Sequence, residues 1–463
     1  MMNQPAPYQS IIDQQNAYFQ QGKTKSYSAR IDALRALEKA VREHENDVLQ
    51  ALHADLRKHP QEAYMTEIGP LYGEINYLRK HLKRWMQARP ASSPIALLPG
   101  SSTIYPEPLG MVLIITPWNY PFLLSLRAAA GAIAAGNTVI LKPSEMSPNT
   151  SAILEKIIRS ALSPELFAVV TGEGHTVIPN LLQYHHFDHI HFTGSTAVGS
   201  KIMEMAAKHL SPVTLELGGK SPAIIAADAP ISVTAKRIVW GKFLNCGQTC
   251  VAPDYLLVHR SIWDKTIQAL KEAIVHAFGD NPQTSESYPR IIHDRRFATL
   301  ASYLNQGNIL HGGQTDATDR YIAPTLLSDV SLDAPIMREE IFGPILPIIP
   351  FDTEEEALTI IARNPYPLAL YVFSRNSKTQ RRFIDEVRFG GGCINETILQ
   401  LGNEQLPFGG VGYSGHGQYH GEHSFNTFSH FKSVVRKATW FEPSFRHPPF
   451  TKGKLNIIRR ILG

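Results

Sequence analysis

The sequence feature that most constrains the fold is a series of short apolar runs that begins at residue 111. The runs are Met111–Thr116, Thr138–Leu141, Phe167–Val170, His189–Phe192 and Ala223–Ala226. Each has the length of a buried strand, and helical segments lie between most of them. Short buried strands that alternate with helices predict an α/β fold, in which helices cover both faces of a parallel sheet.

Helices are expected before this region, and a second α/β unit is expected after it. Apolar residues spaced by three and four over 31–41 predict an amphipathic helix, and a further helical stretch covers about 62–87. The Pro- and Ser-rich stretch Pro90–Pro108 interrupts the helical pattern, so we expect it to be an excursion that packs elsewhere. The second α/β unit is expected over about 233–405, and the cleft between two such units is a natural substrate site.

The composition excludes several classes of protein. The 463 residues are 43% hydrophobic and 19% charged, which is typical of a soluble globular chain. A net charge of +4 does not indicate nucleic-acid binding, and three cysteines cannot build a disulfide framework. We expect a cytoplasmic protein without a membrane span, because the polar N-terminus and the short apolar runs match no targeting or spanning segment. Residues 452–463 could form a small amphipathic helix, so weak peripheral membrane contact stays open.

Two segments carry the glycine spacing of nucleotide-binding loops, in different contexts. In Phe192–Gly199 a predicted strand ends, Gly194 turns the chain and a helix begins near Thr196. The N–H groups of that helix end could bind a phosphate, although the G-x-x-x-x-G spacing also suits a plain strand-to-helix turn. Gly410–Gly415 matches G-x-G-x-x-G, but no strand precedes it and no helix follows, so we interpret it as a structural turn.

Cys250 is the candidate nucleophile, after Gly247-Gln-Thr. A free thiol has a pKa of about 8.5 and needs a positive local field to become a thiolate, so a buried, inert cysteine is the alternative. Zinc is disfavoured, because Cys246 and Cys250 supply two thiolates where a structural site needs four ligands. Cys246 could protect the nucleophile under oxidation or be a packed small residue.

Glu216 and Asn119 each lie near the end of a predicted strand. Glu216 has apolar neighbours, and burial would raise its pKa toward that of a general base, while a salt bridge to Lys220 is the alternative. Asn119 lies in Pro117-Trp-Asn-Tyr-Pro121, at the strand end where ligands bind in such sheets. Its amide could donate a hydrogen bond to an oxyanion or form a turn between the prolines.

Further polar residues lie after predicted strands or before turns. Lys142 and Glu145 come directly after a predicted strand and could hold ribose hydroxyls or form a solvated turn. Glu339–Pro344 places two acidic residues before an aromatic residue and a tight turn. Four histidines occur within 185–191, but only one acidic residue and no cysteine accompanies them at ligand spacing. We therefore expect no metal site.

Taken together, these segments resemble the aldehyde dehydrogenase superfamily from about residue 20 to 450. Seven motifs occur in the order found there, which makes the resemblance specific. The Trp240-Gly-Lys-Phe run and the segment 419–430 resemble the class 3 branch, which includes fatty and aromatic aldehyde dehydrogenases. The motifs are Pro117-Trp-Asn-Tyr-Pro121, Lys142-Pro-Ser-Glu145, Phe192-Thr-Gly-Ser195, Leu215-Glu-Leu-Gly-Gly219, Gly247-Gln-Thr-Cys250, Glu340-Ile-Phe-Gly-Pro344 and Pro407-Phe-Gly-Gly410.

The resemblance implies NAD(P)-dependent oxidation of an aliphatic (medium- or long-chain) or aromatic aldehyde to the acid. Cys250 would attack the aldehyde carbon, and Asn119 with the Cys250 backbone N–H would hold the oxyanion. Glu216 would activate the water that hydrolyses the thioester. A coenzyme A-acylating enzyme and a non-catalytic protein that retains the fold are the alternatives, and the presence of Glu216 argues against the first. The residues expected to line the substrate tunnel are Tyr120, Trp240 and Leu244.

The resemblance also implies how the cofactor is bound. Lys142 and Glu145 would contact the adenine ribose, and the helix that begins after Ser195 would bind the pyrophosphate. NAD is favoured and NADP is an alternative, because a carboxylate at Glu145 suits a free 2′-hydroxyl. Glu340 and Phe342 would position the nicotinamide ribose and ring. The full set expected to bind the cofactor is Lys142, Glu145, Gly194, Ser195, Gly199, Leu217, Glu340 and Phe342.

The implied architecture is an aldehyde dehydrogenase-like fold with a small oligomerisation arm. We expect a homodimer, with an arm formed by a strand near Ser102–Pro106 and by the segment after Gly417. The expected parts are a Rossmann-type NAD(P)-binding domain (1–85 and 107–232), an α/β catalytic domain (233–410), the arm (86–106 and 411–440) and a C-terminal tail (441–463).

Overall fold

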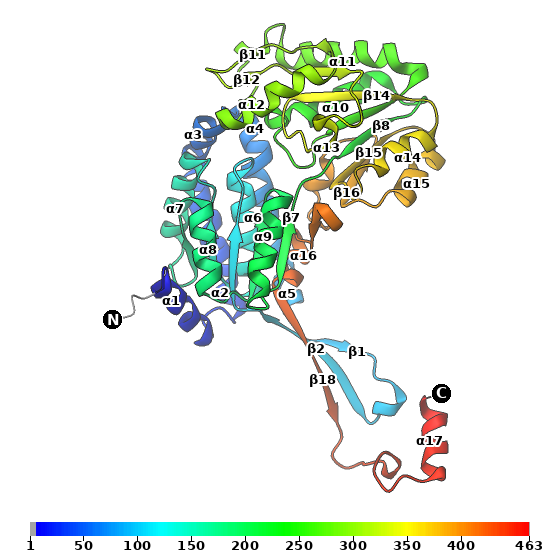
Figure 1. Cartoon of the computed structure of the whole chain (residues 1–463). Helices are drawn as coiled ribbons and strands as arrows, with labels where there is room; N and C mark the ends of the chain where they lie inside the picture. Colours follow the sequence, from blue (N-terminus) through cyan, green and yellow to red (C-terminus); the bar gives the residue numbers. More distant parts are fainter. Residues whose placement is uncertain (1–5, 463) are drawn as a thin grey trace.

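The segment from residue 111 to 216 forms five strands of a six-stranded sheet in the computed structural model, which describes residues 6–462. The strands of this sheet are β3 (Met111–Ile115), β4 (Thr138–Lys142), β5 (Phe167–Val169), β6 (His189–Thr193), β7 (Val213–Glu216) and β17 (Gly415–His416). They lie in the order β17-β7-β6-β3-β4-β5, and all neighbours are parallel except β17 and β7. Every residue of β3, β4 and β6 is buried, because helices cover both faces (Figure 1).

Two layers of helices enclose this sheet. On one face, apolar side chains of four helices form a core with β3 and β4; these helices are α2 (Tyr27–Glu43), α5 (Gly69–Trp85), α6 (Pro121–Ala135) and α7 (Pro148–Ala161). On the other face lie α1 (Gln9–Gln20), α8 (Gly174–Tyr184) and α9 (Thr196–Ala207). Between α2 and α5 the chain forms α3 (Glu45–Leu56), α4 (Pro60–Ala63) and a π-helical turn, Tyr64–Ile68.

The second lobe is built on a seven-stranded sheet. Its strands are β8 (Pro222–Ile225), β9 (Tyr255–His259), β10 (Asn308–His311), β13 (Thr325–Ser328), β14 (Ile345–Phe351), β15 (Ala369–Phe373) and β16 (Gly391–Ile394). They lie in the order β10-β13-β14-β9-β8-β15-β16, and only β10 is antiparallel to its neighbour. The helices of this lobe include α10 (Ile231–Phe243), α11 (Trp263–Phe278), α12 (Asp294–Tyr303), α14 (Glu354–Ala362) and α15 (Ser377–Glu386).

The structure corrects two placements that the sequence predicted. The run Ala223–Ala226, expected in the first sheet, contains β8 and pairs with β9 and β15 of the second. The chain crosses between the sheets at Gly218 and Gly219, where a side chain on Gly219 would lie 3.2 Å from the Leu368 backbone nitrogen. The segment from 411, expected in the arm, first adds β17 to the first sheet and then forms α16 (Gly421–Thr427), which packs on α5 and α6.

A three-stranded antiparallel sheet projects from the first lobe as an arm (Figure 1). It consists of β1 (Arg89–Ala91), β2 (Gly100–Pro108) and β18 (Ser429–Lys437), so the predicted excursion at Pro90–Pro108 is part of it. A terminal helix, α17 (Lys452–Leu462), follows beyond the arm, and none of its residues is buried. Within residues 6–462, no helix is both long and apolar enough to cross a membrane.

Candidate active site

A cavity of about 210 Å³ lies where the two lobes meet, and it contains both candidate reacting groups. The first lobe contributes Tyr120 from the start of α6 and Glu216 from the end of β7. The second lobe contributes Cys250 and the end of α10. Residues 130 positions apart in sequence thereby face one enclosed space, at the carboxyl ends of parallel strands where α/β folds bind ligands.

The loop before Cys250 has an unusual backbone conformation. Asn245 and Cys246 have left-handed φ values of 51° and 55°, and Gly247 follows at 73°. Non-glycine residues in this region cost about 1–3 kcal/mol each, so the surroundings must hold them there. Gln248 does part of this, because its amide donates to the carbonyl groups of Asn245 (3.1 Å) and Arg290 (3.0 Å) and accepts from the backbone N–H of Ile292 (3.0 Å).

Asn245 also connects this loop to Asn119. The Asn245 amide donates to the Asn119 carbonyl at 2.7 Å and to the Gln248 carbonyl at 3.2 Å. The Asn245 backbone N–H donates to a carboxylate oxygen of the buried Glu62 at 2.8 Å. Buried Lys58 donates to the same Asn119 carbonyl at 3.0 Å, and the Asn119 amide donates to the Gln248 carbonyl at 3.1 Å. The predicted oxyanion residue and the nucleophile loop therefore belong to one hydrogen-bond network.

Glu216 is buried without a hydrogen-bond partner. Within residues 6–462, neither oxygen of its carboxyl group is bonded, and burial raises its pKa well above the usual value. The alternative salt bridge to Lys220 is wrong, since Lys220 pairs with Asp254 and donates to the carbonyl groups of Ile336 (2.7 Å) and Glu339 (2.9 Å). An unpaired buried carboxyl group is costly and typical of a site that exchanges protons.

The thiol of Cys250 is protonated at neutral pH in this state. Burial is the main reason that its pKa rises to about 12, and the nearby carboxyl groups of Glu340 and Glu216 add to the shift. Since the thiolate is the nucleophilic form, a base has to remove this proton before the sulfur can attack. Among residues 6–462, Glu216 is the carboxylic acid that lines the same cavity.

Largely apolar side chains form the rest of the cavity wall. The predicted tunnel residues Tyr120, Trp240 and Leu244 all line it, and the Tyr120 hydroxyl is 2.6 Å from the Thr249 hydroxyl. Sequence analysis did not assign several other residues to the cavity wall, because they come from segments of both lobes that are distant in sequence. These are Met65, Thr66, Pro70, Leu123, Leu124, Arg127, Thr193, Thr249, Ile398, Leu399, Leu401, Gly402, Phe408, Tyr419 and His420.

The predicted ribose-binding pair lies beyond the end of β4. Lys142 is almost fully buried and forms an ion pair with Glu145. The other oxygen of Glu145 accepts the backbone N–H of Gly174 at 2.9 Å, at the start of α8. The ion pair with Lys142 and this backbone bond lower the pKa of Glu145, against the opposing effect of burial, so its carboxylate is charged at neutral pH.

The predicted phosphate loop leads directly into α9. Ser195 caps this helix, and its hydroxyl accepts the Val198 backbone N–H at 3.4 Å. A side chain on Gly199 would lie 2.7 Å from Leu217, and one on Gly194 would lie 2.5 Å from the ring of Phe192. These glycines let β6, β7 and α9 pack closely, while the first turn of α9 stays exposed with backbone N–H groups available to an anion.

Glu340 and Phe342 of the second lobe reach the first lobe next to the Gly218 bend. A side chain on Gly218 would lie 2.0 Å from a Glu340 oxygen and would have to displace that carboxyl group. Burial raises the pKa of Glu340 to about 8. Phe342 packs edge-on against Trp118 at a centroid distance of 5.4 Å, beside the Asn119 segment. The two predicted nicotinamide residues thus lie beside the Gly218 bend and beside Trp118.

Two other sequence hypotheses concern groups outside the cavity. His189 and His191 share one face of β6, as expected, and pack against Phe428 at 5.4 and 6.0 Å. Within residues 6–462, no three His, Cys, Asp or Glu side chains come together in a way that could hold a metal ion. Cys246 is fully buried in the core of the second lobe, which favours its interpretation as a packed residue.

Comparisons with known proteins agree with this geometry. The chain matches the model of the aldehyde dehydrogenase family over residues 2–434. It is 46% identical to 4,4'-diaponeurosporen-aldehyde dehydrogenase of Staphylococcus aureus, over 97% of this chain and 99% of the relative. It is 43% identical to the "Aldehyde dehydrogenase, dimeric NADP-preferring" of Canis lupus familiaris, over 95% and 97%. The solved substrate-bound state of Staphylococcus aureus AldH is similar, with a TM-score of 0.95 and 44% identity over 98% and 99% of the chains. The chain therefore belongs to the aldehyde dehydrogenase family and is an oxidoreductase.

Proposed function

We propose that this enzyme oxidises apolar aldehydes to carboxylic acids with NAD(P), through a thioester on Cys250 that Glu216 helps to hydrolyse. The observation that carries the proposal is the shared cavity, in which the thiol of Cys250 and the unpartnered carboxyl group of Glu216 face the same 210 Å³ space. A nucleophile and a base in one water-poor cavity are what acyl-enzyme chemistry needs.

The first half of the reaction forms the thioester. Glu216 accepts the Cys250 proton, the sulfur bonds to the aldehyde carbon, and the carbonyl oxygen becomes an oxyanion. The Asn119 amide, which has a second N–H beyond the one given to Gln248, and the backbone N–H of Cys250 stabilise this oxyanion. A nicotinamide cofactor, held by the residues described above, would supply the acceptor for the hydride of the substrate carbon. With that acceptor in place, collapse of the oxyanion would leave a thioester on Cys250.

The second half of the reaction releases the acid. Glu216 first releases the thiol proton to solvent and then takes a proton from a water molecule, whose oxygen attacks the thioester carbon. The carbon–sulfur bond then breaks, and Cys250 leaves as a thiolate that recovers a proton. Because this step needs a base and no second acyl acceptor, the free carboxyl group of Glu216 supports a hydrolytic enzyme over the coenzyme A-acylating alternative.

The cofactor residues fit a dinucleotide. The exposed first turn of α9 supplies backbone donors for a pyrophosphate, and the glycines around it leave no side chain in the way. The charged carboxylate of Glu145 suits a ribose with a free 2′-hydroxyl, which supports NAD, while a relative named NADP-preferring supports NADP as an alternative. The apolar cavity wall supports an aliphatic or aromatic aldehyde.

The test follows the absorbance of reduced nicotinamide with NAD or NADP and a series of aldehydes from acetaldehyde through decanal to benzaldehyde. We expect turnover with apolar aldehydes by the parent enzyme and none by Cys250→Ala. Added coenzyme A should not raise the rate. Turnover that survives in Cys250→Ala, or that requires coenzyme A, would contradict the proposal. No turnover by the parent would favour the non-catalytic alternative.

A further inference from the structure

A fully buried ion pair lies next to the Asn119 segment, outside the catalytic cavity. Lys58 and Glu67 are both 0% exposed, and the Lys58 ammonium is 2.5 Å from a carboxylate oxygen of Glu67. Neither side chain lines the cavity. In a pair buried this deeply, the cost of removing both charges from water offsets most of their attraction. Stability alone therefore does not explain the pair, and its other contacts indicate a role.

The Lys58 ammonium makes two further contacts, and both are with residues of the catalytic site. It donates to the backbone carbonyl of Asn119 at 3.0 Å, and it lies 4.0 Å from the ring centroid of Tyr120. The Asn245 amide donates to the same carbonyl, so both lone pairs of this oxygen are used. These contacts fix the backbone of the residue whose side-chain amide is proposed to hold the oxyanion.

Glu67 fixes the chain directly after this residue. The carboxylate oxygen that does not face Lys58 accepts the backbone N–H groups of Phe122 (2.9 Å) and Leu123 (3.3 Å), in the first turn of α6. Tyr120, at the N-cap position of α6, provides no side-chain cap, so a carboxylate 55 residues earlier in the sequence takes that place. The ion pair therefore holds both the oxyanion segment and the start of the helix that follows it.

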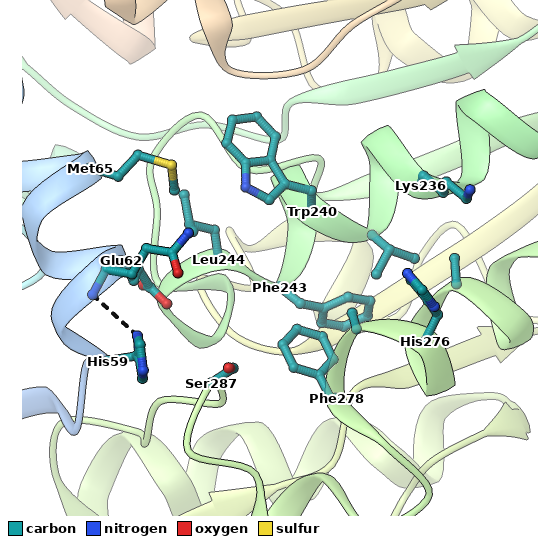
Figure 2. Close-up of a pocket in the computed structure, with 14 residues that line it drawn as sticks. His59, Glu62, Met65, Lys236, Trp240, Phe243, Leu244, His276, Phe278 and Ser287 are labelled. Carbon is teal, nitrogen blue, oxygen red and sulfur yellow. Dashed lines mark hydrogen bonds between the residues drawn. The ribbon is translucent and has the colours of Figure 1, made fainter.

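The segment that carries the ion pair is also attached to the second lobe. Figure 2 shows Glu62 of this segment beside Leu244, at the end of α10. The carboxyl group of Glu62 accepts the backbone N–H of Asn245 at 2.8 Å. Residues 58–67 thus contact the Asn119 segment of the first lobe and the nucleophile loop of the second, so they can set the position of one relative to the other.

We propose that Lys58 is a positioning residue for the oxyanion site, which keeps the Asn119 amide in register with Cys250. Lys58 touches no reacting atom and acts through the Asn119 backbone. The inference rests on the proposed function and adds to it a residue that lies outside the cavity. A displacement of about 1 Å in a group that stabilises the transition state can lower a rate about a hundredfold, so a small movement of this amide has a large effect.

The test removes both charges of the ion pair and keeps the volume of its side chains. In Lys58→Met/Glu67→Gln no buried charge is left alone, and the glutamine can still accept the N–H groups of α6. The measurement is kcat and KM for one apolar aldehyde, with the two substitutions placed in the parent and in an Asn119→Ala background. Leu37→Ala, a truncation of a fully buried residue in the core of the same lobe, is the control for lost stability.

We expect the two substitutions to lower kcat about tenfold to a hundredfold in the parent and to leave KM within threefold. In the Asn119→Ala background they should lower kcat less than twofold, because the donor that Lys58 positions is absent. Leu37→Ala should leave kcat within twofold. Lys58→Arg serves in the same two backgrounds if the double variant does not fold, since its larger planar group keeps the charge and displaces the carbonyl.

Three results would contradict the positioning role and leave the reaction intact. An equal loss of kcat in both backgrounds would mean that Lys58 acts on folding or on a group other than Asn119. An unchanged kcat, or a change confined to KM, would mean that the oxyanion donor does not depend on Lys58. A parent enzyme that reduces neither NAD nor NADP with any aldehyde would instead overturn the proposed function.

Discussion

At the scale of single residues, the site depends on a strained loop that hydrogen bonds keep in place. Asn245 and Cys246 adopt left-handed conformations five and four residues before the nucleophile. Their cost, about 1–3 kcal/mol each, is offset by bonds from Asn245 to Glu62, Asn119 and Gln248. Asn245 touches no substrate position in the cavity, so we regard it as a positioning residue for Cys250 and Asn119.

Replacing Asn245 should therefore lower the rate of chemistry rather than substrate binding. We expect Asn245→Ala to reduce kcat about tenfold to a hundredfold and to leave KM within threefold, because small displacements of reacting groups have effects of this size. Steady-state kinetics with one apolar aldehyde measures both constants. Asn245→Gly, which relaxes the left-handed backbone but lacks the amide, separates strain from hydrogen bonding. A change confined to KM would contradict the positioning role.

The raised pKa of Cys250 predicts how the free enzyme reacts with alkylating agents. Because the pKa of this thiol is about 12, the thiolate fraction should rise about tenfold for each pH unit between 7 and 10. The measurement is the rate of iodoacetamide labelling at Cys250, followed by mass spectrometry of the labelled peptide without cofactor. Cys250→Ala gives the background from Cys246 and Cys393. A labelling rate that levels off near pH 8 would contradict the raised pKa.

At the scale of elements, β6 carries two histidines that the sheet keeps neutral. Burial lowers the pKa of His189 to about 4 and that of His191 to about 3. The unfolded chain takes up these protons near pH 6.5, whereas the folded chain does not until the lower values are reached. Stability is therefore lost as the pH falls below 6.5, by about 1.4 kcal/mol per pH unit for each histidine.

Removing one of these histidines should make the protein less sensitive to acid. His191→Phe keeps an aromatic ring beside Tyr419, 4.9 Å away, and removes two ring nitrogens without a partner in the described chain. We expect the free energy of unfolding, from urea titrations between pH 4.5 and 7, to depend less steeply on pH by about 1.4 kcal/mol per unit. An unchanged slope would show that His191 does not carry the effect.

Local sequence patterns predicted most of the strands and helices. They failed where the position of a segment depends on contacts with residues that are distant in sequence. The apolar runs correctly predicted the strands β3 to β6, and the glycine turn correctly predicted the start of α9 at Thr196. The run at Ala223 looks the same as those strands, and only the bend at Gly218 and Gly219 sends it to the other sheet. β17 has two residues, too few for any pattern, and it exists because Glu216 and Leu215 offer partners.

At the scale of the whole molecule, the arm is the part whose exposed position is not explained by contacts within a single chain. β2 and β18 pair over nine residues away from both cores, and Val434 and Val435 on β18 are 44% and 49% exposed. The unpaired backbone groups of an exposed edge strand are a template for pairing with another chain. The homodimer that the family resemblance implies, and that a relative named dimeric supports, would cover it.

The mass of one chain is 51.5 kDa, and we expect light scattering to give twice this value. In the double variant Val434→Asp/Val435→Asp, we expect the measured mass to shift toward that of one chain. Charges on an apolar interface carry a desolvation cost that the folded monomer avoids. Ser433→Asp, at an exposed position of the same strand, is a control for added charge alone. A stable monomer in the parent would remove the dimer proposal. A cytoplasmic location stays a prediction.

The candidate site could be predicted where a short sequence motif contains the functional residue itself. Cys250, Glu216 and Asn119 each sit in a short recognisable segment, and the fold brings the first two to one cavity wall and links the third to them. Glu62 and Asn245 had no such signal, because their roles arise from contacts across more than 100 residues. Such contacts come from the packing of the lobes, which no local spacing encodes.

The most direct test of the central claim is a single turnover of Glu216→Gln with NAD and an apolar aldehyde. Without a base for water, hydride transfer can occur once, but the thioester should persist. We predict that about one equivalent of reduced nicotinamide forms per active site, that steady turnover falls at least a hundredfold, and that mass spectrometry finds the acyl group on Cys250. Because Glu216 also takes the thiol proton, the burst in this variant should become faster as the pH rises from 7 to 10. Full steady turnover, or an acyl group on any other residue, would contradict the account.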